Sequence, residues 1–313
     1  MQSLIENPLI NLLTTHQILD LKHLEPFHDK VRDMDGIKVL RDRTTGLVVL
    51  DKINHISFEY YENNVNYTTG RDMVHTKSGT ITTKFLDDNL RRVKMYGPYF
   101  KGKSILDFGC GRGEFVLMLH KKKHEVYGLE PNKWNREYIE GKGVKCFSSI
   151  ETLEPDRKFD YIVLNHVFHH LTDPLTILKQ LKKHLKKDGA IILEVRHGND
   201  FLINSLNDGS FRDFTFCSEH LILHTHDSLL KLCKAGGFKN TSVHYYQRFP
   251  LSNHIHWFLQ RKPGGHAILD YFNTPQLVKQ YAKVITNRKE TDTLIAILPN
   301  GNPTGIENCF KLK

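Results

Sequence analysis

Short apolar runs alternate with longer amphipathic stretches between about residues 104 and 196, a pattern typical of βα units on a parallel sheet. Two further apolar runs follow after longer intervals. The strands expected from all these runs cover residues 104–109, 125–130, 144–147, 160–165, 190–196, 238–246 and 293–298. The pattern therefore predicts an α/β sheet of seven strands with helices on both faces.

The helix expected before residues 190–196 shows the clearest amphipathic pattern. Leucines recur at positions 175, 178, 181 and 185, at spacings of three and four, and lysines fall mostly between them. The helix is predicted to begin at Thr172-Asp173-Pro174 and to stop at Asp188-Gly189. A second helix is expected from Asp227 to about Ala235, ended by Gly236-Gly237.

Residues 1–100 lack this alternation and predict a separate N-terminal module. Within it, residues 37–51 read as two strands joined at a Thr-Thr-Gly turn. Residues 101–313 form the main domain, with insertions at about 197–226 and 248–290. Long insertions at strand ends are usually functional, so we expect them to contribute to substrate binding.

Composition narrows the class of protein. The chain is 39% hydrophobic, and no apolar run approaches the roughly 18 residues of a membrane span. Residues 1–17 contain no Lys or Arg and no small-residue cleavage site, so we expect no secretory signal and a cytoplasmic protein. Without a C-x-x-C pair, the cysteines predict reduced thiols and no zinc ribbon. They are Cys110, Cys146, Cys217, Cys233 and Cys309.

The meaning of the net charge of +9 depends on where the basic residues lie. A continuous basic stripe indicates nucleic-acid binding, whereas scattered lysines do not. Residues 1–100 hold equal numbers of acidic and basic side chains, so the excess lies beyond them. It is concentrated at Lys121–Lys123 and in five lysines between 179 and 187. We interpret both clusters as solvated helix surface, since neither falls at the strand ends where ligands bind in such sheets.

The first strand of the main domain ends in a glycine-rich loop, Asp107-Phe108-Gly109-Cys110-Gly111-Arg112-Gly113-Glu114. Glycines let the backbone approach a ligand closely, and the helix start behind them offers free N–H groups. The next strand ends at Glu130, 21 residues beyond Gly109, where a carboxylate can accept both hydroxyls of a ribose. The ligand should therefore contain a nucleoside.

A dinucleotide site would place its third glycine at position 114, which is Glu. The acidic-x-Gly-x-Gly-x-Gly loop and the acidic end of strand two instead resemble the class I S-adenosylmethionine-dependent methyltransferases, whose sheet is Rossmann-like. Residues 159–174, FDYIVLNHVFHHLTDP, resemble that family's fourth-strand motif, and the resemblance covers roughly residues 100–247. It implies that S-adenosylmethionine is the cofactor.

The resemblance implies a set of cofactor-binding residues. Asp107, Gly109 and Gly111 would hold the methionine end and Glu130 the ribose. Cys110 is expected to be a small side chain in a tight loop and not a nucleophile, because no basic partner is evident nearby. The full predicted set is Asp107, Gly109, Cys110, Gly111, Gly113, Glu130, Pro131, Ser148, Ser149, Asn165 and His166.

Methyl transfer to a hydroxyl needs a base. Residues 214–238 contain Glu219-His220 just before the helix expected from Asp227 to about Ala235. This segment resembles sugar methyltransferases of bacterial deoxysugar and surface-polysaccharide (capsule, lipopolysaccharide) pathways, whose base sits in such a Glu-His pair. His220 is the candidate base, Glu219 its orienting acid and His169 the second candidate base. An equally good interpretation is that His220 is a loop histidine whose hydrogen bonds are satisfied and which has no catalytic role.

Residues 247–266 and 291–298 also resemble those carbohydrate enzymes, with two departures. The sugar C-methyltransferases of this group begin with a zinc ribbon and continue into a further C-terminal domain. Residues 41–46 carry none of the ribbon's cysteines, and we expect the chain to be too short for that further domain. We therefore expect no metal, and O-methylation of a nucleotide sugar or glycan in place of C-methylation. Tyr60, Tyr61 and Tyr67 could close over the cofactor, although packing against the main domain is the simpler role.

Two other functions stay open. A nucleic-acid methyltransferase is suggested by the pI of about 9.1 but lacks the Asn/Asp-Pro-Pro-aromatic motif, because Asn165 is followed by His-Val-Phe. A cofactor-binding scaffold without catalysis is disfavoured by the two intact cofactor motifs. The patterns do not predict the oligomeric state.

Overall fold

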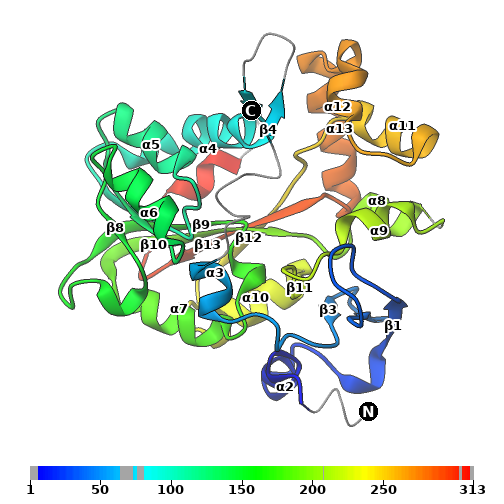
Figure 1. Ribbon diagram of the computed structural model, residues 1–313, viewed down its shortest axis with the longest axis horizontal. Helices are drawn as coiled ribbons and strands as arrows, with labels where there is room; N and C mark the ends of the chain where they lie inside the picture. The colour runs from blue at the N-terminus through cyan, green and yellow to red at the C-terminus, as the bar shows by residue number, and fades with distance from the viewer. Residues whose placement is uncertain (1–5, 64–72, 76–80, 207, 303–304, 311–313) are drawn as a thin grey trace.

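The computed structural model describes residues 6–63, 73–75, 81–206, 208–302 and 305–310 (Figure 1). Its centre is a seven-stranded sheet in the order β12-β13-β10-β9-β6-β7-β8, which confirms the predicted α/β fold. The strands β6 to β10 are parallel, while β13 runs antiparallel between β10 and β12. Their bounds are β6 Ser104–Phe108, β7 Glu125–Leu129, β8 Cys146–Phe147, β9 Phe159–Asn165, β10 Leu185–Arg196, β12 Ser242–Tyr246 and β13 Thr293–Pro299.

Helices cover both faces of this sheet, with α4 and α5 above and α7 and α10 below in Figure 1. Ile105, Val163 and Ile192 pack into one hydrophobic cluster with residues of α4, α5 and α6. Their chain neighbours Leu106 and Leu193 join the other cluster, with residues of α7 and α10. This division follows from the two-residue period of a β-strand. The helices are α4 Lys84–Phe100, α5 Glu114–Lys121, α6 Lys133–Glu140, α7 Pro174–Lys183 and α10 His226–Ala235.

The prediction that the helix before β10 continues to Asp188 was wrong. Helix α7 ends at Lys183, and Leu185 already pairs with Phe159 of β9. Lys186 therefore lies on the strand, where its ammonium contacts Asp160 at 2.7 Å. The leucine spacing could not reveal this, because Leu185 is buried whether it belongs to a helix or to a strand. Likewise, β12 begins at Ser242 and not at 238.

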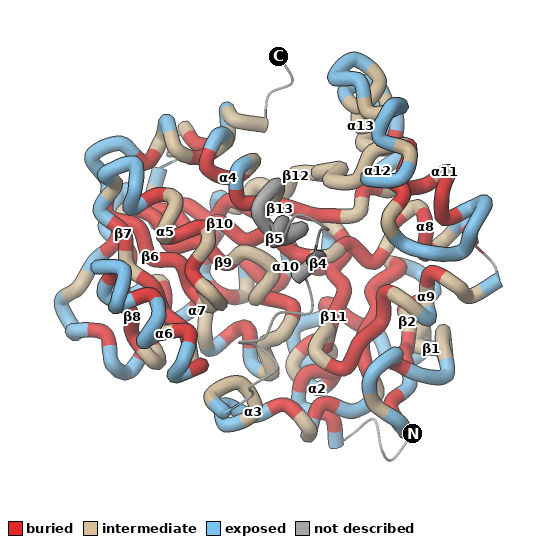
Figure 2. Tube along the Cα trace, turned by 45° about the horizontal axis from the view of Figure 1, so that its top comes forward, coloured by how far each residue is buried: buried red, intermediate tan, exposed pale blue. Residues whose placement is uncertain are grey.

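The N-terminal hairpin is confirmed, and it belongs to a second sheet in the order β1-β2-β3-β11. Its turn is closed by Asp42, whose carboxylate accepts the backbone N–H groups of Thr44 and Thr45. The fourth strand, β11, comes from the insertion after β10, so the two parts of the chain share one sheet. Figure 2 shows buried residues running through both regions. The bounds are β1 Leu24–His28, β2 Val39–Asp42, β3 Val48–Leu50 and β11 Ile222–Leu223.

The remaining elements lie around these two sheets, and α11 to α13 extend away from the main sheet at the upper right of Figure 1. Among the described residues, no helix has the length and apolar character needed to cross a bilayer. The bounds are α2 Pro8–Thr15, η1 Leu21–His23, α3 Phe58–Glu62, β4 Met73–His75, β5 Ile81–Thr83, η3 Ile150–Thr152, η4 Phe168–His170, α8 Phe201–Ser205, α9 Ser210–Thr215, α11 Leu251–Gln260, α12 Gly265–Ile268, η5 Asp270–Phe272, α13 Pro275–Arg288 and η6 Ile306–Phe310.

Candidate active site

A cavity of about 800 Å³ opens at the carboxyl ends of β6, β7, β9 and β10. In doubly wound sheets this edge is where ligands bind. One end of the cavity, here called the donor end, is formed by the glycine loop and the ends of β7 and β9. The other, the acceptor end, is formed by α3, η4, the end of β10 and the residues that precede β11.

The glycine loop has positive φ angles at all three glycines, but their roles differ. A Cβ at Gly109 would lie 2.6 Å from Cγ2 of Val167, so the loop packs directly on the chain after β9. A Cβ at Gly111 would meet no heavy atom within 4 Å, which leaves the backbone exposed to the cavity. Gly113 does not line the cavity, contrary to its predicted role in cofactor binding, because it packs at the start of α5 against Ile139.

The carboxylate of Glu130 is fixed at the donor end by two backbone groups. Its Oε2 accepts the N–H of Gly111 at 2.8 Å, and its Oε1 accepts the N–H of Asn132 at 2.9 Å. Burial raises the pKa of Glu130 and raises that of Asp107 to about 7. Both carboxyl groups line the cavity, so a ligand that donates hydrogen bonds to them would compensate for their desolvation.

The other predicted cofactor residues also line the cavity. The sulfur of Cys110 lies 3.9 Å from that of Cys146, and this contact, followed by burial, raises the pKa of Cys110, as expected of a packing thiol. The side-chain amide of Asn165 is buried beside the carboxyl group of Asp107, with which it interacts. His166, which follows it, has a left-handed φ of 57°, an uncommon backbone conformation found often at functional sites. Pro131, Ser148 and Ser149 complete the set.

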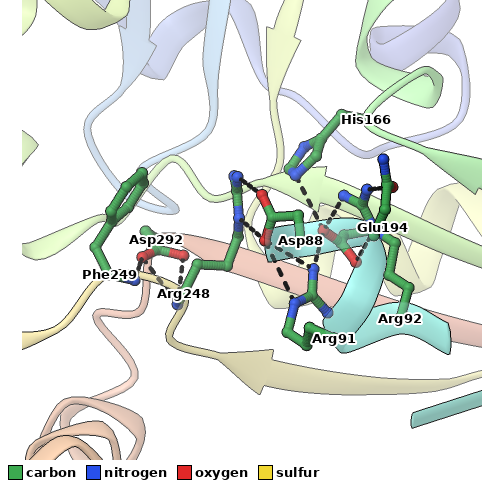
Figure 3. Close-up of polar contacts among 9 residues, drawn as sticks. Asp88, Arg91, Arg92, His166, Glu194, Arg248, Phe249 and Asp292 are labelled. Carbon is green, nitrogen blue, oxygen red and sulfur yellow. Dashed lines mark hydrogen bonds and ion pairs between the residues drawn. The ribbon is translucent and has the colours of Figure 1, made fainter. Parts of the chain in front are cut away.

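A network of charged side chains fixes the floor of the cavity beside His166 (Figure 3). Glu194 of β10 is fully buried and accepts hydrogen bonds from Arg91 and Arg92 of α4, both at 2.7 Å. His166 Nε2 lies 3.0 Å from the same carboxylate. Burial alone would raise the pKa of Glu194, but Arg92 and Arg91 hold it well below its usual range. The network therefore contains an ionised carboxylate.

Arg248 joins the insertion after β12 to this network. Its guanidinium contacts Asp88 of α4, and its backbone N–H donates to Asp292. Burial would raise the pKa of Asp88, yet the charge of Arg248 holds it well below its usual range. No sequence motif predicted the charged network of Asp88, Glu194 and Arg248. Glu194 stands inside the apolar run AIILEVR, and a carboxylate in such a strand indicates a buried partner of opposite charge.

Three histidines meet at the acceptor end. The ring of His169 lies 4.5 Å from that of His170 and 5.0 Å from that of His220, measured between ring centres. Burial is the largest cause that lowers the pKa of each: to about 4 for His170, and well below the usual value for His169 and His220. The imidazoles are therefore neutral near pH 7.

The protonation of His220 follows from its partner. Nδ1 lies 3.3 Å from the backbone oxygen of Thr215, and a carbonyl can only accept, so Nδ1 carries the proton. Nε2 is left with its lone pair. The predicted orientation of His220 by Glu219 is not what the contacts show, because the carboxylate of Glu219 accepts the hydroxyl of Tyr60 at 3.0 Å. Both residues line the cavity with His169.

Nitrogen atoms of the three histidines lie within 4.8 Å of one another, so they could hold a metal ion by geometry alone. Electrostatics oppose this. The charge of Arg196 acts on both His220 and His170, and that of Arg32 also acts on His220. These positive charges disfavour a divalent cation, while the carboxylate of Glu219 acts on His170 in the opposite direction.

The predicted aromatic residues lie partly at this end of the cavity. Tyr61 of α3 lines the cavity, and burial raises the pKa of its hydroxyl. Tyr60 packs against it, with ring centres 5.1 Å apart. Tyr67 lies outside the described residues.

Comparison with known proteins shows which family this chain belongs to. The methyltransferase domain family matches residues 81–243, just over half of the chain. A tRNA U34 carboxymethyltransferase from Alteromonas mediterranea is 31% identical over 119 residues, which cover 33% of this chain and 35% of that protein. A demethylmenaquinone methyltransferase from Bacillus licheniformis is 24% identical over 185 residues, which cover 50% and 79%. A solved SAM-dependent methyltransferase from Archaeoglobus fulgidus is 18% identical, with a TM-score of 0.47 over 68% of this chain and 94% of that one.

Fold, site and family match define an S-adenosylmethionine-dependent methyltransferase. The chain belongs to the methyltransferase domain family. It spans about a third of the length of the carboxymethyltransferases that it matches. The Alteromonas relative is named for a tRNA substrate and the Bacillus relative for a quinone, so the resemblance to sugar methyltransferases is not confirmed.

The donor end fits the cofactor of this class. Gly111 leaves room beside its backbone, Glu130 presents a fixed carboxylate, and the carboxyl group of Asp107 lines the cavity beside the amide of Asn165. These groups match a ligand with ribose hydroxyls and an amino-acid end.

Proposed function

We propose that this protein methylates a hydroxyl of a sugar, carried on a nucleotide or in a surface glycan, during bacterial polysaccharide biosynthesis. Asp107, Gly109 and Gly111 hold the methionine end of S-adenosylmethionine, and Glu130 holds its ribose. When bound, that cofactor supplies an electrophilic methyl group on its sulfonium. Asn165 and His166 border the reacting end.

His220 is the proposed general base. The observation that carries this role is the contact with Thr215, which fixes the Nδ1–H tautomer and leaves Nε2 free to accept a proton. The lowered pKa of His220 keeps the ring neutral before the reaction, so Nε2 has a free lone pair for the proton of the acceptor hydroxyl. His169 is the second candidate, and Glu219 acts on the site through Tyr60. No metal takes part in this proposal.

Replacing His220 tests the assignment. His220→Ala should lower kcat by roughly 10²- to 10⁴-fold and leave cofactor affinity nearly unchanged, because the base lies at the acceptor end. His226→Ala serves as a matched control, since His226 starts α10 outside the cavity. Full activity of the His220 variant would transfer the role to His169.

The acceptor class is tested by incubating the enzyme with the cofactor and a panel of nucleotide sugars and glycans. Mass spectrometry should detect a gain of one methyl group on a sugar. A parallel arm with transfer RNA tests the alternative suggested by the name of the Alteromonas relative. Methylation of RNA alone would replace the sugar proposal.

A further inference from the structure

Two arginines at the acceptor end lack a carboxylate partner among the residues that the structure describes. Arg196, at the end of β10, donates to the hydroxyl of Thr215 at 3.3 Å. Arg32 donates to the backbone oxygen of Phe214 at 2.8 Å. Neither contact neutralises a charge. Arg92 and Arg248 also line the cavity, but each forms an ion pair with a carboxylate, of Glu194 and Asp88 respectively.

The placement of Arg196 is electrostatically unfavourable without a ligand. Burial lowers the pKa of Arg196, and the charges of Arg248 and Arg32 lower it further, while Cys217 and Asp200 act in the opposite direction without reversing the shift. A desolvated charge is expensive unless it is paired, and a structural arginine would normally have a carboxylate beside it. Arg32 adds a second positive charge from the N-terminal module. Among the described residues, neither guanidinium is therefore neutralised by an ion pair, although Asp200 and Glu219 act on this region from farther away.

We propose that Arg196 and Arg32 bind an anionic group, a phosphate or a carboxylate, carried by the methyl acceptor. A guanidinium matches both groups because it donates two parallel hydrogen bonds. This inference rests on the proposed function, which it narrows to charged sugars: a nucleotide-linked sugar offers phosphate, and a uronic acid offers carboxylate. Both arginines act on the charge state of His220, so the anion lies beside the proposed base.

Calorimetry with the enzyme saturated with S-adenosylhomocysteine tests this proposal without methyl transfer. The probes are pyrophosphate, glucuronate and neutral glucose. Arg196→Gln should weaken binding of the charged probe by about 10- to 150-fold, the effect of one charged hydrogen bond. Arg196→Lys should weaken it less. Arg43→Gln, which removes an exposed arginine outside the cavity, should leave it unchanged.

Preferential loss of pyrophosphate binding identifies a phosphate, and loss of glucuronate binding a carboxylate. Equal affinities in the wild type and Arg196→Gln, or binding of glucose as strong as that of both charged probes, overturn the proposal. Arg196→Gln should also melt at the same temperature as the wild type or higher, because it removes a partly buried charge that forms no ion pair among the described residues. A lower melting temperature would assign Arg196 a structural role. Anion binding without any sugar methylation would contradict only the proposed function.

Discussion

The carboxylate of Glu130 is held in position by the backbone N–H groups of Gly111 and Asn132, whether or not a ligand is bound. Two N–H groups fix its oxygens, and each oxygen keeps a lone pair that can accept a ribose hydroxyl. A single residue thus connects the glycine loop, the start of α6 and the predicted nucleoside site. The sequence predicts that this carboxylate lies near the glycine loop, because its spacing from Gly109 follows from a local βαβ unit.

Glu130→Ala should weaken cofactor binding by about 1.5–3 kcal/mol for each charged hydrogen bond lost, as measured by calorimetry. Glu130→Gln keeps the size of the side chain and should lose less. Glu140→Ala, at an exposed position of α6, should bind the cofactor like the wild type. An unchanged affinity of the Glu130→Ala variant would refute the ribose assignment.

Asp107 makes stability depend on pH. Its pKa is raised from 3.8 to about 7 by burial, so the folded protein binds a proton more tightly than the unfolded chain. Its contribution is therefore fully present below pH 4 and is lost as pH rises through about 7. Compared with Asp107→Asn, the wild type without cofactor should lose up to about 4 kcal/mol between pH 4 and pH 8.

Urea unfolding of both proteins at several pH values measures this difference. Asp200, whose pKa is also raised to about 7, is present in both and cancels in the comparison. A difference that does not vary with pH would show that Asp107 is ionised throughout.

At the scale of elements, the β2–β3 turn shows how this hairpin holds together without cysteines. The Asp42 carboxylate accepts two backbone N–H groups, and the N–H of Gly46 donates to the carbonyl of Asp42. Gly46 has a φ of 80°, which suits glycine. The turn is closed by hydrogen bonds formed by residues of the loop itself.

Treatment with a chelator should therefore leave the melting temperature and the activity unchanged. The arginines beside the three histidines lead to the same expectation for the acceptor end. Elemental analysis of the purified protein checks both regions. A stoichiometric metal, or activity lost with the chelator and restored by a metal ion, would contradict this prediction.

At the scale of the whole molecule, the sequence predicted what depends on local periodicity. The seven strands, the glycine loop and Glu130 all follow from patterns within short windows. The acceptor end could not be predicted in this way, because His169 and His220 come from distant segments that only the fold brings together. Arg32 lies still farther away in the chain. The end of the helix near Leu185 could not be predicted either, since burial alone does not distinguish the end of a helix from the start of a strand.

Strand β11 links the two stretches of chain that form the acceptor end. It pairs with β3, and the segment before it carries Glu219 and His220, while the N-terminal module carries Arg32 and Tyr61. The N-terminal module and the segment before β11 therefore form one structural unit, which is separate from the cofactor loops. A chimera that imports another enzyme's N-terminal module keeps an intact sheet only when that enzyme's matching strand is imported with it.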